Sequence, residues 1–200
     1  MLTLKTFIAE SRTYTGTMYH GSGSRFDKFE QSKARIPNDF YGGGVAYFTD
    51  DVGVGITYAK SMAKTSKGEP IVYTVKVKFK KLFDVDEVFK GKDLVGILPD
   101  DVNSFARGVG LMGLNADEFV IIAKLKSGKM ELTGDQVFKG LSKGMNTTAK
   151  AREYLVSKGY DGLRYNGGVN MDMAKKHNVY LSYNAKNIEI IKRQIVKKKS

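Results

Sequence analysis

The alternation of side chains between positions 71 and 79 constrains the fold of this chain more than any other feature. Apolar residues from Ile71 to Phe79 occupy every second position, and polar residues fill most of the positions between them. Side chains of a strand point to opposite faces in turn, so this period of two predicts a strand with one buried face. The other face becomes basic where Lys76 and Lys78 stand. A sheet therefore belongs to the core of the protein.

Shorter segments on both sides of this strand predict a mixture of helices and strands. We expect strands at 17–20, 45–49, 160–165, 178–183 and 188–195, and helices at 27–35, 51–64, 102–106, 135–141 and 147–157. Segments 119–125 and 129–132 fit either a helix or a strand. Short helices mixed with mostly non-adjacent strands predict an α+β fold. We expect one domain over residues 13–195, between a leader at 1–12 and a basic tail at 196–200.

Composition excludes several kinds of site. The chain has no cysteine and only two histidines, which rules out disulfides, thiolate zinc sites, a cysteine nucleophile and a three-histidine metal site. We expect no metal. The longest apolar run, Phe119–Ala123, is far shorter than the roughly 20 residues that span a bilayer, so no membrane partner is expected. The protein is expected to act as a monomer.

The charge balance points to acidic partners. The 200 residues include 33 Lys and Arg against 21 Asp and Glu, a net charge of +12 with both histidines neutral. Such a surface favours nucleic acid, a phosphorylated small molecule or an acidic protein. The alternative is that these are ordinary solvated lysines.

Two motifs look informative but have simpler explanations. The segment Gly108–Gly113 matches G-x-G-x-x-G, yet the residues before it are polar and helix-like, whereas a dinucleotide site needs a buried strand there. The pairs Asp50–Asp51 and Asp100–Asp101 could bind a hard cation, but helix caps and turns explain them better.

Three segments together suggest a pocket for a flat ring that carries an amide. Tyr19-His20-Gly21-Ser22 ends a predicted strand, and Gly21 would leave its backbone amide groups open to a planar amide. Tyr47 lies on a strand and Tyr58 follows eleven residues later on a helix, so their rings could enclose a heteroaromatic ring such as nicotinamide. Taken one at a time, the tyrosines could equally be core aromatics and the histidine a turn residue.

The three segments in this order resemble the ADP-ribosyltransferase superfamily, in the branch of diphtheria-type toxins and poly(ADP-ribose) polymerases. The branch is marked by His, Tyr and Glu on three strands. Y-H-G-S at 19–22 is similar to its first motif, and A-Y-F-T-D at 46–50 with the step to Tyr58 is similar to its second. G-Y-D-G-L-R-Y-N at 159–166 and N-V-Y-L-S-Y-N at 178–184 are similar to its closing strands.

The resemblance implies two small, roughly perpendicular sheets with peripheral helices around a cleft for NAD⁺, which is the substrate. It implies that His20 holds a ribose hydroxyl, that Gly21 holds the carboxamide, and that Tyr47 and Tyr58 enclose the nicotinamide. Ser22 and Phe48 would line the same site. The implied activity transfers one ADP-ribose unit to a macromolecular acceptor, which is a host protein or a nucleic acid.

One position departs from the family pattern. Val179 stands where the family has its glutamate, and valine cannot accept a hydrogen bond from the ribose. An acidic side chain of the acceptor could substitute for it, or Asp172 could reach the site. In the remaining alternatives the chain is an inactive module that binds NAD⁺ or ADP-ribose, or a basic nucleic-acid-binding protein.

The first residues carry a weaker resemblance. L-K-T-F-I-A-E-S at 4–11 is similar to the leaders of head-packaged proteins of large tailed bacteriophages, in which a protease cuts after [I/L]-x-E. The resemblance implies cleavage after Glu10, storage in the capsid interior near DNA, and action in the host cytoplasm after delivery.

Overall fold

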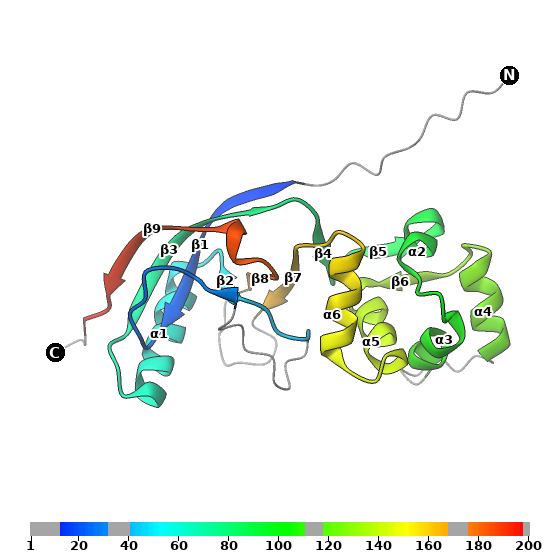
Figure 1. Ribbon diagram of the computed structural model, residues 1–200, viewed down its shortest axis with the longest axis horizontal. Helices are drawn as coiled ribbons and strands as arrows, with labels where there is room; N and C mark the ends of the chain where they lie inside the picture. The colour runs from blue at the N-terminus through cyan, green and yellow to red at the C-terminus, as the bar shows by residue number, and fades with distance from the viewer. Residues whose placement is uncertain (1–12, 32–40, 111–117, 168–175, 198–200) are drawn as a thin grey trace, which may run out of the picture.

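The structure is a computed structural model that describes residues 13–31, 41–110, 118–167 and 176–197 (Figure 1). Its strands are β1 (Tyr14–Ser22), β2 (Ala46–Thr49), β3 (Ile71–Phe79), β4 (Leu82–Asp84), β5 (Val88–Lys90), β6 (Glu131–Thr133), β7 (Gly162–Gly167), β8 (His177–Ser182) and β9 (Ile188–Ile195). Its helices are α1 (Val52–Ser66), α2 (Gly91–Ile97), α3 (Val102–Gly110), α4 (Glu118–Lys126), α5 (Gly134–Gly144), α6 (Thr148–Ser157) and a 3₁₀ turn η2 (Ala185–Asn187). The α+β class predicted from the sequence is confirmed.

Seven strands form one sheet in the order β4-β7-β8-β2-β1-β3-β9, and β5 pairs with β6 in a separate small sheet. All pairs are antiparallel except β4–β7. The expected arrangement of two small sheets differs from this one, because β1 and β2 join both halves. The join is narrow: β1 pairs with β3 along its whole length but with β2 only at Tyr19↔Thr49.

Alternation along the strands gives the large sheet two different faces. We call one the aromatic face, because Met18, Phe48 and Tyr180 lie there in a core with Tyr73 and Phe79. The other is the helical face, where Leu163 and Leu181 pack into a second core formed largely by α2 to α6. Helix α1 lies on the helical face as well, against the C-terminal part of β1.

Helix α1 forms where the sequence predicts it. The Asp51 carboxylate caps its first turn by accepting hydrogen bonds from the backbone N–H groups of Gly53 and Val54. The helix ends at Lys67, whose φ of 54° is left-handed. Gly21 and Gly55 allow the close contact with β1: a Cβ atom at Gly21 would lie 2.4 Å from the Gly55 carbonyl oxygen.

The helix predicted for 27–35 is wrong over its described part. Residues 27–30 form no helix, and positions 32–35 lie outside the described residues. The reason is a tertiary contact: Phe26 and Phe29 enter the aromatic face, where Phe26 stacks on Tyr73 with ring centroids 4.1 Å apart. The Tyr73 hydroxyl also accepts a hydrogen bond from the Phe26 N–H, at 2.8 Å. These contacts hold the segment against the sheet.

The segments that fitted both helix and strand are now assigned. Residues 119–125 lie within α4, and β6 occupies 131–133. The segment 102–110 is helix α3, and Gly108 packs against the backbone of Gly140 in α5, so the G-x-G sequence serves helix packing. Positions 111–113 of that motif lie outside the described residues.

Candidate active site

His20 ties β1 to β2 beyond the point where their pairing stops. Its Nδ1 lies 2.8 Å from the carbonyl oxygen of Tyr47. A carbonyl oxygen only accepts, so Nδ1 carries the proton and donates it. Burial lowers the pKa of His20 to about 4, which keeps the ring neutral at pH 7. A neutral imidazole protonated at Nδ1 leaves Nε2 as an acceptor, the group that can bind a hydroxyl.

Aromatic rings surround the imidazole, which therefore lies on the aromatic face, the side of the sheet opposite to the Tyr47 side chain and α1. Phe29 and Phe48 approach it with centroid distances of 5.2 and 5.8 Å, and Phe26 and Tyr73 lie slightly farther away. Phe48 is only 2% exposed on the aromatic face. The sequence-based assignment of Phe48 to the ligand-binding wall is therefore wrong: strand alternation turns its ring away from the helical face, and the ring supports His20 instead.

Gly21 and Tyr47 point to the helical face, where α1 carries Tyr58. Strand alternation points both Gly21 and Tyr47 to this face, but β1 and β2 pair only at Tyr19↔Thr49, so no strand pairing joins these two residues. On the α1 side, a Cβ atom built on Gly21 would lie 2.8 Å from the Cβ of Tyr58. The predicted pairing of the two tyrosine rings stays a prediction.

The β1 edge at Gly21 is open toward β2. Among the described residues, β1 pairs with β2 no farther than Tyr19, so Gly21 and Ser22 have no strand partner on that side. The Ser22 hydroxyl closes a turn, donating to the Ser24 carbonyl at 2.9 Å and accepting from the Ser24 N–H. Its predicted role in lining the site stays a prediction, and its hydroxyl already has partners in this turn.

The hydroxyl of Tyr47 is buried and makes no hydrogen bond. Leaving a buried hydroxyl without a partner costs about 1–3 kcal/mol. The ring packs against the helical core, and burial raises the pKa of Tyr58 on the neighbouring helix. An unpaired polar group of this kind marks a place where a ligand atom could lie.

The glycine loop before β2 holds Tyr47 in place. Gly42 and Gly43 adopt left-handed φ values of 76° and 66°. Arg152 of α6 donates to the Gly42 carbonyl at 3.0 Å, and Val45 donates to Ser182 of β8 at 2.8 Å. A side chain at position 42 would meet the Thr148 carbonyl oxygen at 2.4 Å, so this close contact requires glycine.

Val179 lies opposite Thr49 in the β2–β8 pair and is 6% exposed. Val179 therefore lies in β8, next to the strand that carries Tyr47, and its alignment with the family's glutamate stays a prediction. Asp172, the predicted alternative acid, lies outside the described residues. The nearest described carboxylate along β2 is Asp50, which accepts from the Asn178 backbone N–H at 3.0 Å and from its side-chain amide at 2.6 Å.

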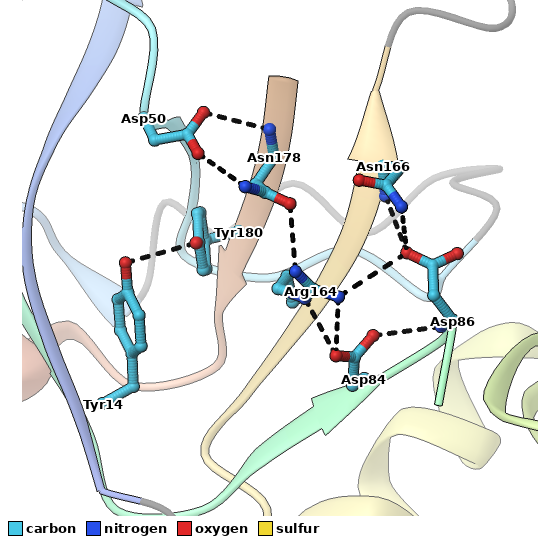
Figure 2. A network of polar contacts seen from close by, with 8 residues as sticks. All are labelled: Tyr14, Asp50, Asp84, Asp86, Arg164, Asn166, Asn178 and Tyr180. Atoms are coloured by element: carbon cyan, nitrogen blue, oxygen red, sulfur yellow. Dashed lines mark hydrogen bonds and ion pairs between the residues drawn. The ribbon is translucent and has the colours of Figure 1, made fainter. Parts of the chain in front are cut away.

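Sequence analysis missed a polar network that continues from Asp50 across the sheet (Figure 2). Arg164 donates to the Asn178 side-chain oxygen at 3.0 Å and pairs with Asp84 at 2.7 Å. Asp86 extends the network to Asn166, whose side-chain amide donates to it at 2.7 Å. No motif signals this cluster, because its members come from four segments that only the sheet order brings together.

A shallow polar pocket of about 310 Å³ adjoins the network. It is lined by Asp50, Asp51, Asn166, Lys176, His177 and Asn178. Asp51 serves as the cap of α1, and Asp101 accepts from the Ser104 N–H, so both residues act as caps, as predicted. Within the described ranges, no group of three or more His, Asp or Glu side chains could hold a metal ion.

No protein-family model, curated protein or solved structure matches this chain. No helix in the part of the chain that the structure describes is long and apolar enough to cross a membrane.

Proposed function

We propose that this protein is an NAD⁺-dependent mono-ADP-ribosyltransferase. The observation that carries the proposal is the position of Gly21: it packs against α1 at Tyr58, and its neighbour His20 is bonded to the Tyr47 carbonyl. These are the residues that the resemblance assigns to NAD⁺, and they come from three elements separated in the chain. The buried, unpaired Tyr47 hydroxyl adds support, because a ligand would give it a partner.

In this proposal the nicotinamide ring lies between Tyr47 and Tyr58. Each stacking contact contributes about 0.5–1.5 kcal/mol, and the positively charged ring gains more from the electron-rich faces. The open β1 edge at Gly21 offers backbone groups to the carboxamide, as another strand would. His20 turns toward the aromatic face and the two tyrosines toward the helical face, so this proposal requires the ribose to reach Nε2 of His20 at the point where β1 and β2 stop pairing.

The reaction breaks the bond between the ribose C1′ and the nicotinamide nitrogen. The bonding electron pair leaves with the ring, which departs as neutral nicotinamide, and a nucleophile of the acceptor forms the new bond to C1′ and loses its proton. The transition state resembles an oxocarbenium ion, so groups that stabilise positive charge on the ribose accelerate it. Val179 supplies no such group. The acceptor's own carboxylate, or Asp172, is assigned that role.

Incubation with NAD⁺ labelled in its adenylate part tests the proposal. We expect label to enter macromolecules of a bacterial lysate, and free nicotinamide to appear in equal amount. The variant His20→Asn should lose both signals, and Lys92→Gln, a change on exposed α2, should lose neither. NAD⁺ binding in calorimetry without transfer or nicotinamide release would favour an inactive binding module. Absence of binding would overturn the proposal.

Val179→Glu provides a second test. If Val179 occupies the position of the missing acid, the new carboxylate should raise the rate of nicotinamide release to water. Val179→Gln has the same shape without the charge and should not raise it. Equal rates in the two variants would argue against the proposed alignment of β8.

A further inference from the structure

Part of the helical face is not covered by any described helix. Helix α1 packs on β1 and β3 only near one end, where Gly55 contacts Tyr19 and Val72. At the other end, the residues of β1 and β3 that point to the same face are solvent-exposed: Thr15, Thr17, Lys76 and Lys78. The edge strand β9 extends this surface with Lys192, which is paired to Thr74. We call these five residues the lysine face.

The strand register gives the lysine face a regular pattern. Thr15 is paired with Lys78 and Thr17 with Lys76, so hydroxyls and ammonium groups lie side by side on neighbouring strands. Lys76 and Lys78 are two residues apart on one strand, which separates their Cα atoms by about 6.7 Å. The face therefore presents hydrogen-bond donors in two adjacent rows.

The lysine face keeps an excess of positive charge, although Glu189 of β9 points to the same face. Lys76, Lys78 and Lys192 take part in none of the ion pairs of the described residues. Glu189 lies opposite Lys76 on β9, but the two form no ion pair. Like charges this close repel each other, and an anionic partner would remove that cost. Exposed lysines that the fold leaves unpaired add to the net charge of +12.

We propose that the lysine face is a docking surface for the phosphate backbone of a nucleic acid. A phosphodiester chain carries one negative charge per nucleotide, which matches lysines repeated along a strand. The threonine hydroxyls can donate to phosphate oxygens, as hydroxyl side chains often do in such interfaces. A membrane-binding face would instead need apolar or aromatic side chains among its lysines. Thr15 and Thr17 occupy those places here.

The lysine face shares strand β1 with Gly21. Thr17 and Gly21 are four positions apart and point to the same face of the strand, so their Cα atoms are about 13 Å apart. A nucleic acid held on the lysine face would thus pass close to the candidate active site. Docking itself does not depend on the proposed NAD⁺ chemistry.

Fluorescence anisotropy with a labelled single-stranded oligonucleotide of mixed sequence tests this inference. The full chain should bind, and the triple variant Lys76→Gln, Lys78→Gln, Lys192→Gln should bind roughly tenfold or more weakly. Its plot of log affinity against log salt concentration should become shallower by about 2, from three lost phosphate contacts at about 0.7 each. All three side chains are exposed and their replacement removes like-charge repulsion, so the melting temperature should not fall.

The matched control removes the same charge elsewhere. Lys92, Lys124 and Lys150 are exposed on three helices, and their replacement by glutamine should leave affinity and salt slope close to those of the wild type. An equal loss in both triple variants would mean non-specific attraction and would overturn the inference. So would binding to vesicles rich in phosphatidylserine with none to the oligonucleotide, which would identify a membrane as the partner. Loss of NAD⁺ binding with oligonucleotide binding intact would overturn only the proposed function.

Discussion

The imidazole of His20 donates a hydrogen bond to the backbone carbonyl of Tyr47, at 2.8 Å, where β1 and β2 have otherwise stopped pairing. This single contact links two residues of the candidate site that are 27 positions apart. It also fixes the tautomer, because a carbonyl oxygen accepts only from a protonated Nδ1.

His20→Asn should separate the two functions of this side chain. An asparagine amide can replace Nδ1 as the donor to Tyr47 but cannot replace Nε2. We expect the free energy of unfolding to fall by less than about 1 kcal/mol, and NAD⁺ affinity to fall at least roughly tenfold, since one hydrogen bond to a ligand is lost. Denaturant titration and calorimetry measure the two quantities. Unchanged NAD⁺ affinity would contradict the assigned role of Nε2.

Stability should fall when the pH is lowered through the range set by His20. In the unfolded chain this histidine has a pKa near 6.5, and burial lowers it to about 4 in the folded protein. Between these values the unfolded state binds more protons, so stability is complete above pH 6.5 and decreases toward pH 4. The loss is at most about 3 kcal/mol. Urea titrations at several pH values should show a smaller decrease for His20→Asn than for the wild type.

Tyr47→Phe should stabilise the protein in the absence of ligand. The variant removes a buried hydroxyl that has no hydrogen-bond partner, which should raise the free energy of unfolding by about 1 kcal/mol. Tyr73→Phe is the matched control. The Tyr73 hydroxyl accepts a hydrogen bond from the Phe26 N–H, so its removal should lower the free energy of unfolding by about 1–2 kcal/mol. Equal effects of the two changes in thermal denaturation would refute this assignment.

Gly21→Ala should separate α1 from the sheet. The new methyl group would lie 2.4 Å from backbone atoms of Gly55 and Ala59, so helix or strand must move. We expect a loss of about 1–3 kcal/mol, the usual cost of overpacking. Gly96→Ala in α2 has no atom within 4 Å of its new methyl group and should instead stabilise the helix by up to about 1 kcal/mol.

Arg164→Met should destabilise the edge of the sheet. Arg164 is half-buried and holds Asp84 of β4 and Asn178 of β8, so its loss leaves polar groups without partners. A decrease of about 1–3 kcal/mol is expected, and a further change of Asp84 to Asn should restore part of it. Lys139→Met, which breaks an exposed pair with Asp135 in α5, should cost less than about 1 kcal/mol. Similar decreases in the free energy of unfolding in both variants would mean that the Arg164 network contributes no more to stability than an exposed ion pair.

Local sequence patterns were sufficient to predict most of the helices and strands. The strands predicted at 71–79 and 188–195 have those bounds in the structure, and the first is marked by strict alternation, which is a short-range signal. The cap at Asp51 and the glycine stop after α6 were also visible, since each involves backbone groups only a few residues away. The segment 27–31 was not predictable, because distant Tyr73 decides its conformation.

The amino-acid sequence by itself determined the α+β class, most of the strands and helices, and the residues that make up the candidate site. Only the tertiary structure decided that one sheet runs through both halves, that Phe48 faces away from Tyr47, and that Arg164 joins Asp84 to Asn178. It also decided that α1 leaves the lysine face uncovered. The physical reason is the distance along the chain over which each signal acts. Helix caps and side-chain periodicity involve residues only a few positions apart. Strand order, and which face of each strand is buried, depend on apolar surfaces that are distant in the chain and are buried together.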